Sequence, residues 1–189
     1  MRTLYLLLFI CFIPACTSYI CNNHTDKNPS YSAQADASGQ KKITGLVASV
    51  LDGDTFVLDT GSGQTGKIRL YGIDAPELKQ PWGAESKQAL AALINQQPIT
   101  VIIVGTDRYG RTIGKVYKDG QYINLLMVSG GHAWHYTQYA PKDGDLQLAE
   151  QSARAARLGL WQSPSAKPPW AERRPRWLKA DSARFLIAY

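Results

Sequence analysis

Apolar and polar positions alternate in three short runs in the first half of the chain, a pattern typical of half-buried β-strands. The runs cover residues 43–52, 54–60 and 66–73 and have the sequences ITGLVASVLD, DTFVLDT and GKIRLYGI. Asp-Gly and Gly-Ser-Gly sequences separate them, and such sequences form the tight turns of antiparallel hairpins. The pattern therefore predicts a meander of three strands.

The spacing of apolar residues changes after the third strand. In residues 86–94 they recur every three or four positions, which predicts a helix, and Pro98 prevents its continuation. The apolar run at 99–104 predicts a fourth strand. Residues 111–120 predict a fifth strand, which closes on another Asp-Gly turn.

Two further segments have helical character. Residues 122–131 end in two glycines that are typical of a helix stop. Residues 144–161 predict a last amphipathic helix, with one face formed by Leu146, Ala149, Ala153 and Ala156. Five short strands with about three helices favour an α+β, mainly β fold, built on a five-stranded Greek-key barrel of the oligonucleotide/oligosaccharide-binding (OB) type.

Composition indicates where the domain begins and ends. The chain has 189 residues, of which 44% are hydrophobic and 19% charged, as expected for one globular domain with flanking segments. We assign that domain to residues 41–163. The net charge of +6 comes mainly from a Pro-, Trp- and Arg-rich tail at 164–189, which holds six basic and two acidic residues. Charge alone is a weak indication of polyanion binding, so function has to be argued from a site.

The N-terminus predicts export. Met1 and Arg2 precede an apolar core of about ten residues, and small Ala15 suits cleavage before Cys16. That core is too short for a membrane span, which needs roughly 20 residues. We therefore predict a signal peptide at 1–15, followed by a polar, disordered linker at 16–40.

Two fates are open for Cys16. The sequence around it resembles a bacterial lipobox, in which the cysteine carries lipid and attaches the protein to the cell envelope. The alternative is ordinary cleavage and a periplasmic or secreted protein, in which Cys16 and Cys21 are free to pair. In either case we expect a monomer.

Three polar motifs interrupt the predicted strands and loops: VLDGDTFVL at 50–58, RLYGIDAPE at 69–77 and DRYGR at 107–111. Each has an ordinary structural interpretation when taken alone, respectively a hairpin turn, a charged strand end and a polar loop. Arg69 points away from the face on which its apolar neighbours Ile68 and Leu70 pack, because successive side chains of a strand alternate.

Together the motifs supply a chemically coherent set, because loops converge at one end of a small barrel. The set consists of three carboxylates and two arginines: Asp54, Asp74, Glu77, Arg69 and Arg111. Two carboxylates form a hard oxygen site for Ca²⁺ or Mg²⁺, and a third can accept a proton from water. Two guanidinium groups can bind a phosphate and stabilise its extra charge during hydrolysis.

Residues 42–163 resemble the staphylococcal nuclease (thermonuclease) family, through DGDT, RLYGIDAPE and DRYGR in that order and at those separations. The resemblance implies a sugar-non-specific endonuclease on a five-stranded barrel. Such enzymes cleave DNA and RNA, release the 5′-oxygen and leave 3′-phosphate ends.

The resemblance also implies residue roles. Asp54, Asp74 and the backbone carbonyl of Ala75 would bind Ca²⁺. Arg69 and Arg111 would hold the scissile phosphate, and Glu77 would act as general base or orient the water. The substrate would further contact Arg108, Tyr109, Tyr136 and Tyr139. The chain departs from the family at one of two nucleotide-pocket tyrosines, where Thr137 stands beside Tyr136.

Two alternatives to the nuclease remain at this point. The first is a non-catalytic barrel that binds single-stranded nucleic acid or oligosaccharide at the cell envelope. The second is an envelope lipoprotein whose barrel is only a scaffold. Neither needs all five of the carboxylates and arginines, and their joint presence favours the nuclease.

Overall fold

A computed structural model of the chain describes residues 34–35, 39–61 and 63–173. The predicted signal peptide, Cys16, most of the predicted linker and the tail from residue 174 lie outside the described residues. Within the described part, no helix is both long enough and apolar enough to cross a membrane.

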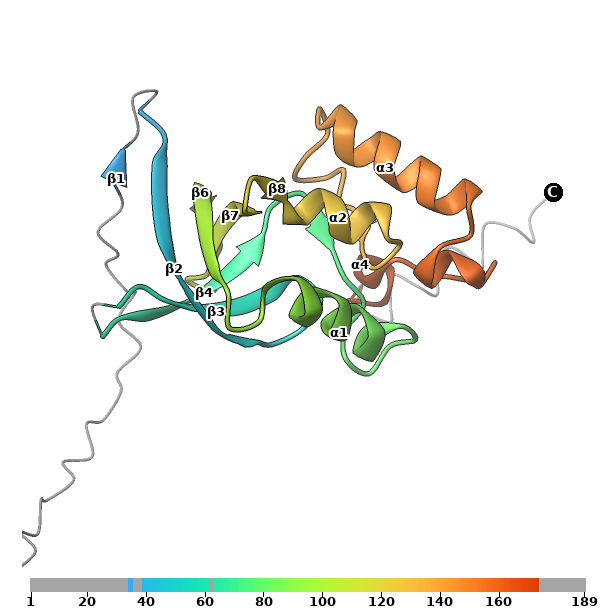
Figure 1. The fold of residues 1–189 in the computed structure, drawn as a ribbon. Helices are drawn as coiled ribbons and strands as arrows, with labels where there is room; N and C mark the ends of the chain where they lie inside the picture. Colours follow the sequence, from blue (N-terminus) through green and yellow to red (C-terminus); the bar gives the residue numbers. More distant parts are fainter. Residues whose placement is uncertain (1–33, 36–38, 62, 174–189) are drawn as a thin grey trace, which may run out of the picture.

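Five strands close into a barrel (Figure 1). They are β2 (Lys41–Val50), β3 (Thr55–Asp59), β4 (Thr65–Leu70), β6 (Pro98–Thr106) and β7 (Thr112–Lys118). Hydrogen bonds join them in the order β2-β3-β4-β7-β6, and β6 pairs back onto β2 to close the ring. The β4–β7 pair is parallel and the other pairs are antiparallel. The predicted five-stranded barrel and mainly β fold class are therefore confirmed.

Short strands extend this framework. They are β1 (Gln34–Ala35), which pairs with β2, β8 (Gln121–Tyr122), which pairs with β7, and β5 (Ile73–Asp74), which pairs with β9 (Trp134–His135). The two residues of β1 belong to the stretch assigned to the linker. The β5–β9 pair matters most for function, because it fixes the chain directly after β4, where the RLYGIDAPE motif runs.

Side-chain alternation along the strands determines what enters the barrel core. On β4, Ile68 and Leu70 are buried inside the barrel, whereas Arg69 between them is only partly buried and lines a cleft. Val101 of β6 and Val116 of β7 face each other across a register pair and are fully buried. This alternation places Arg69 on the face opposite to that of Ile68 and Leu70, as the sequence predicts.

In the part of the chain that the structure describes, four α-helices lie beside the barrel: α1 (Gly83–Ile94), α2 (Ile123–Ser129), α3 (Gly144–Ala155) and α4 (Pro169–Arg173). Figure 1 shows α1, α2 and α3 gathered on one side of the strands. Leu90 of α1, Met127 of α2 and Leu146 of α3 are completely buried in the same core as the barrel residues. Helix α4 was not predicted, and it lies in the segment that the sequence analysis assigned to the tail.

The predicted helix at 144–161 is too long. Helix α3 ends at Ala155, and Ala156, expected on the buried face, is exposed. The chain turns there because Arg157 and Gly159 adopt positive φ angles of 52° and 53°. A Cβ on Gly159 would lie 2.2 Å from the carbonyl oxygen of Gly131, so this close approach requires glycine. A 3₁₀ helix, Gly159–Gln162, follows.

Candidate active site

The DGDT motif forms the turn between β2 and β3 and carries a buried acid. Asp54 is only 3% exposed, so it is not a solvated residue of an ordinary hairpin turn. Its backbone N–H donates to Oδ1 of Asp52 at 3.0 Å. A Cβ on Gly53 would lie 1.9 Å from Oγ of Ser86 on α1, so only glycine permits this packing. The turn is thus pressed against α1, and this holds Asp54 inside the protein.

Arg69 connects the turn to the end of the RLYGIDAPE motif. Its Nη1 donates to Oδ1 of Asp54, and its Nη2 donates to Oδ1 of Asp74 at 2.7 Å. Asp54 also accepts hydrogen bonds from the Thr55 hydroxyl and the Ala75 backbone N–H, both at 2.9 Å. The two acids and the arginine, separated in sequence, therefore form one buried ion-pair network.

The carboxylates of this network influence one another. Burial raises the pKa of Asp74 above its usual range, and the negative charge of Asp54 raises it further. Burial acts in the same direction on Asp54, but Arg69 and the Ala75 N–H hold the pKa of that carboxyl below its usual range. Burial and the charge of Asp54 raise the pKa of Asp52 to about 6. Negative charge is thus concentrated in a place that favours a cation.

Glu77 lies at the rim of the network. Its carboxylate is about half exposed, with 52% of the side chain accessible. Oε1 of Glu77 accepts a hydrogen bond from Nε of Arg173 at 2.9 Å, and Nη2 of Arg173 donates to Oδ1 of Asp74 at 2.8 Å. Glu77 is therefore reachable by water and is linked to the buried acids through an arginine of α4.

The DRYGR loop, between β6 and β7, is organised by its own aspartate. Oδ1 of Asp107 accepts the backbone N–H groups of Tyr109 at 2.9 Å and of Arg111 at 3.0 Å. Oδ2 of Asp107 accepts Nε of Arg111 at 2.7 Å. Nη1 of Arg111 donates to the Thr55 hydroxyl at 3.4 Å, which connects the loop to the Asp54 network. Sequence analysis missed this role of Asp107, although its spacing of four residues from Arg111 is visible in the motif.

We predict that Asp107→Asn destabilises the protein by about 1–2 kcal/mol at pH 7, because charge-assisted hydrogen bonds to Arg111 are lost. Arg111 and two N–H groups lower the pKa of Asp107. Its contribution is therefore present above its unfolded pKa of about 3.9 and is lost as pH falls through the lower folded value. Urea unfolding at pH 7 and near pH 2.5 measures the difference between the variant and the wild type, which should shrink in acid.

The exposed Asp119 provides a matched control, because Asp119→Asn changes the same charge in a turn with positive φ, where Asn is tolerated. An equal destabilisation by Asp107→Asn at both pH values would show that the ion pair contributes nothing.

Aromatic side chains form the opposite wall. The rings of Tyr136 and Tyr139 meet edge to face at a centroid distance of 4.9 Å. Tyr136 also stacks on Trp170 of α4 at 5.0 Å. On the DRYGR side, Arg108 lies over the ring of Tyr109 at 4.8 Å and donates to its hydroxyl at 2.7 Å.

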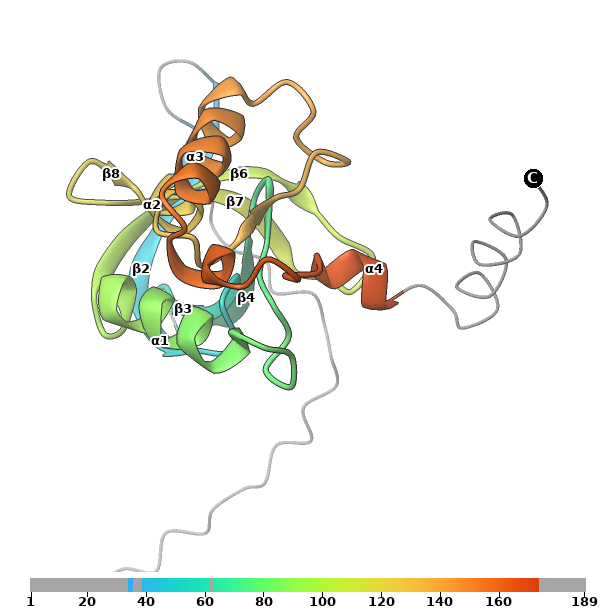
Figure 2. The ribbon, with the colours of Figure 1, turned by 90° about the vertical axis from the view of Figure 1, so that its right-hand side faces the viewer.

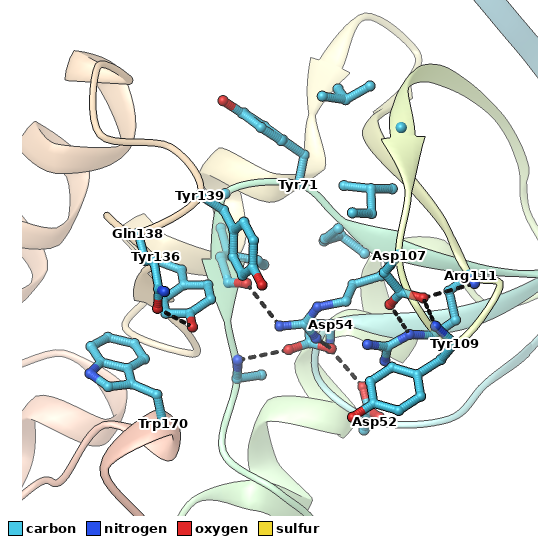
Figure 3. A pocket seen from close by; sticks show the side chains of 18 of the residues that line it. Asp52, Asp54, Tyr71, Asp107, Tyr109, Arg111, Tyr136, Gln138, Tyr139 and Trp170 are labelled. Carbon is cyan, nitrogen blue, oxygen red and sulfur yellow. Dashed lines mark hydrogen bonds and ion pairs between the residues drawn. The ribbon is translucent and has the colours of Figure 1, made fainter. Parts of the chain in front are cut away.

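Most of these groups border one cleft of about 1070 Å³. In Figure 3, Tyr109 and Arg111 lie on one side of Asp54, and Tyr136 and Trp170 lie on the other. The cleft lining includes nine of the ten predicted site residues: Asp54, Arg69, Ala75, Glu77, Arg108, Tyr109, Arg111, Tyr136 and Tyr139. The tenth, Asp74, is fully buried beneath it and is bound to Arg69. The lining also includes Trp170 and Arg173, which the sequence analysis left in the tail.

The buried acids fit a hard divalent cation. Oδ2 of Asp74 is buried and accepts no hydrogen bond from any described residue. An unpartnered carboxylate oxygen in the interior is costly unless a cation or water binds it. In the part of the chain that the structure describes, no three His, Cys, Asp or Glu side chains converge on one point. Backbone carbonyls and water would therefore complete the ligand set, as is common for Ca²⁺.

Comparison with known proteins matches this geometry to a family. A family model described as staphylococcal nuclease homologue matches residues 67–163, which include both RLYGIDAPE and DRYGR. Micrococcal nuclease of Shigella flexneri is 43% identical over 140 residues, covering 69% of this chain and 80% of the relative.

Two further relatives extend the comparison. An Escherichia coli protein named uncharacterized endonuclease is 43% identical over 130 residues, covering 68% of this chain and 83% of that protein. Probable staphylococcal-like nuclease CAN2 of Oryza sativa subsp. japonica is 42% identical over 108 residues, 57% of this chain but 29% of that longer protein. The chain therefore belongs to the staphylococcal nuclease family of hydrolases.

Proposed function

We propose that the chain is a Ca²⁺-dependent, sugar-non-specific endonuclease that hydrolyses DNA and RNA. Its family membership makes it a nuclease, and the proposal concerns the metal, the residues and the chemistry. The observation that carries it is the buried pair Asp54 and Asp74, bridged by Arg69 beneath a cleft that also holds Glu77 and Arg111.

Asp54 and Asp74, with the carbonyl of Ala75, would hold the cation. Bound there, the ion would neutralise negative charge on the phosphate and polarise its P–O bonds. The unpartnered Oδ2 of Asp74 supports this assignment. A barrel that only binds ligands has no need to bury two carboxylates side by side, since their mutual repulsion and desolvation are costly.

The remaining residues would act on the substrate directly. Glu77 accepts a proton from water, whose oxygen forms the new bond to phosphorus. The bond from phosphorus to the 5′-oxygen breaks, and the departing oxygen takes up a proton from solvent. The phosphate stays on the 3′-oxygen.

Arg69 and Arg111 would stabilise the extra negative charge of the five-coordinate phosphorus. A guanidinium group carries five N–H donors, so each arginine can keep its protein partner and still donate to phosphate oxygens. Arg108, Tyr109, Tyr136 and Tyr139 border the same cleft and would contact neighbouring sugar, base or phosphate groups.

We predict that the products carry 3′-phosphate and 5′-hydroxyl ends. The test digests a 5′-fluorescent oligonucleotide of DNA, and one of RNA, with Ca²⁺, and treats the products with a phosphatase that removes 3′-phosphates. A mobility shift of every labelled fragment on a denaturing gel is expected. Fragments that are insensitive to the phosphatase would carry 3′-hydroxyls and would contradict the proposed direction of cleavage.

A further inference from the structure

Helix α4 brings a segment from beyond the family match onto the catalytic carboxylates. The match ends at residue 163, and α4 spans Pro169–Arg173. Figure 2 shows α4 on the right of the view, set apart from α1 and α3. Two of its side chains, Trp170 and Arg173, line the cleft.

Arg173 binds the two acids on which the proposed mechanism depends. Its Nη2 donates to Oδ1 of Asp74 at 2.8 Å, and its Nε donates to Oε1 of Glu77 at 2.9 Å. Oδ1 of Asp74 also accepts from Arg69, so one carboxylate oxygen is shared by two guanidinium groups. In this arrangement, the positive charge that neutralises Asp74 and Glu77 comes from the protein itself.

A divalent ion and Arg173 would compete for the negatively charged carboxylate of Asp74. An ion bound to Asp74 would coordinate the carboxylate oxygens that accept hydrogen bonds from Arg173. Its positive charge would also repel the guanidinium group of Arg173, in a site where Arg69 is already positively charged. Arg173 also occupies Oε1 of Glu77, one of the two carboxylate oxygens to which an attacking water would donate. Removal of Arg173 would therefore free Asp74 for the ion and Glu77 for the water.

The contacts that hold α4 in the cleft are of a kind that can be released. The side chain of Arg173 is 42% exposed and that of Glu77 is 52% exposed, so water competes for their ion pair. Among the described residues of α4, Trp170 also stacks on Tyr136 in the cleft. The helix has only five residues and follows two prolines, Pro164 and Pro168, in a Ser- and Pro-rich connection.

We propose that Arg173 and the divalent ion bind the catalytic carboxylates in alternation, so that α4 is a strap that occupies the ion-free site and is released when the ion binds. This inference rests on the proposed role of Asp74 as a ligand of the ion. Linkage is reciprocal, so the factor by which docked Arg173 lowers the affinity for the ion is also the factor by which the bound ion weakens docking of α4.

The test measures Ca²⁺ affinity directly, by isothermal titration calorimetry without nucleic acid, for the wild type, Arg173→Ala and Arg173→Gln. We expect both variants to bind Ca²⁺ about tenfold more tightly, within the range of about 5- to 150-fold that is typical of coupled sites. Arg154→Ala is the matched control, because Arg154 pairs with Glu150 on α3, outside the cleft. The Ca²⁺ affinity of this variant should equal that of the wild type.

Tryptophan fluorescence supplies a second readout. Ca²⁺ should change the emission of the wild type as Trp170 leaves Tyr136, and Trp170→Phe should remove that change. Before Ca²⁺ is added, Arg173→Ala should already show the emission that the wild type shows with Ca²⁺ bound.

Unchanged or weaker Ca²⁺ binding by both Arg173 variants would overturn the strap while leaving the proposed nuclease intact. Ca²⁺ binding by none of the proteins would refute the proposed metal site, and the strap with it.

Discussion

Glu77→Gln should lower kcat by about 10²- to 10⁴-fold, the range that a positioned general base contributes. Glutamine has the same shape as glutamate but cannot accept the proton of the attacking water. The side chain is half exposed, so its replacement should change neither the fold nor the unfolding midpoint. The measurement is single-turnover cleavage of a labelled oligonucleotide with Ca²⁺ in excess over enzyme.

A matched control separates loss of the base from loss of charge. Glu85→Gln removes the same charge from an exposed position on α1 and should cleave at the wild-type rate. Because Glu77 is not assigned as a ligand, the Glu77→Gln protein should still bind Ca²⁺. A decrease of less than about threefold would mean that another group accepts the proton.

Arg111→Ala should lower kcat/KM by about 10²- to 10³-fold, as loss of one donor to a developing oxyanion does in other hydrolases. The side chain is fixed by Nε on Asp107 and by Nη1 near Thr55, so it presents its other donors to the cleft at little entropic cost. Most of the effect should fall on kcat, because the guanidinium group stabilises charge that develops only in the transition state.

Arg111→Lys should restore little of this activity, since an ammonium group lacks the planar pair of donors that matches two phosphate oxygens. Arg154→Ala on α3 is the control and should retain full activity, because its ion pair lies on the exposed surface. If Arg111→Ala raised KM alone, with kcat unchanged, the arginine would be a ground-state binding residue and not a stabiliser of the transition state.

Local patterns were sufficient to predict the barrel. Alternation in 43–52, 54–60 and 66–73, with glycine-containing turns between them, corresponds to β2, β3 and β4. The alternation on β4 also placed Arg69 opposite Ile68 and Leu70. These features are local, because strand periodicity and turn chemistry depend on residues a few positions apart.

The buried state of Asp54 could not be predicted in the same way. An Asp-Gly turn is normally solvated, and here burial arises because Gly53 permits contact with Ser86 on α1, 33 residues later in the chain. The end of α3 is a similar case, since it depends on the approach of Gly159 to Gly131. Such tertiary contacts have no periodic signal in the sequence.

The part played by α4 was missed for a related reason. Arg173 is 99 residues from Asp74 and 96 from Glu77 along the chain. A five-residue helix is too short to give an amphipathic pattern, and its proline- and arginine-rich surroundings are equally typical of a solvated tail. The family resemblance could not supply it either, because that resemblance ends before α4.

The proposed mechanism requires a divalent ion at Asp54 and Asp74 for cleavage. Its direct test follows cleavage of single-stranded DNA, double-stranded DNA and RNA by residues 34–189, with Ca²⁺, with chelator, and with Ca²⁺ restored after chelation. We predict cleavage that requires Ca²⁺, stops with chelator and returns on restoration, and that Asp74→Asn abolishes without unfolding the protein. Undiminished cleavage in the presence of chelator would contradict a metal-dependent mechanism at this site.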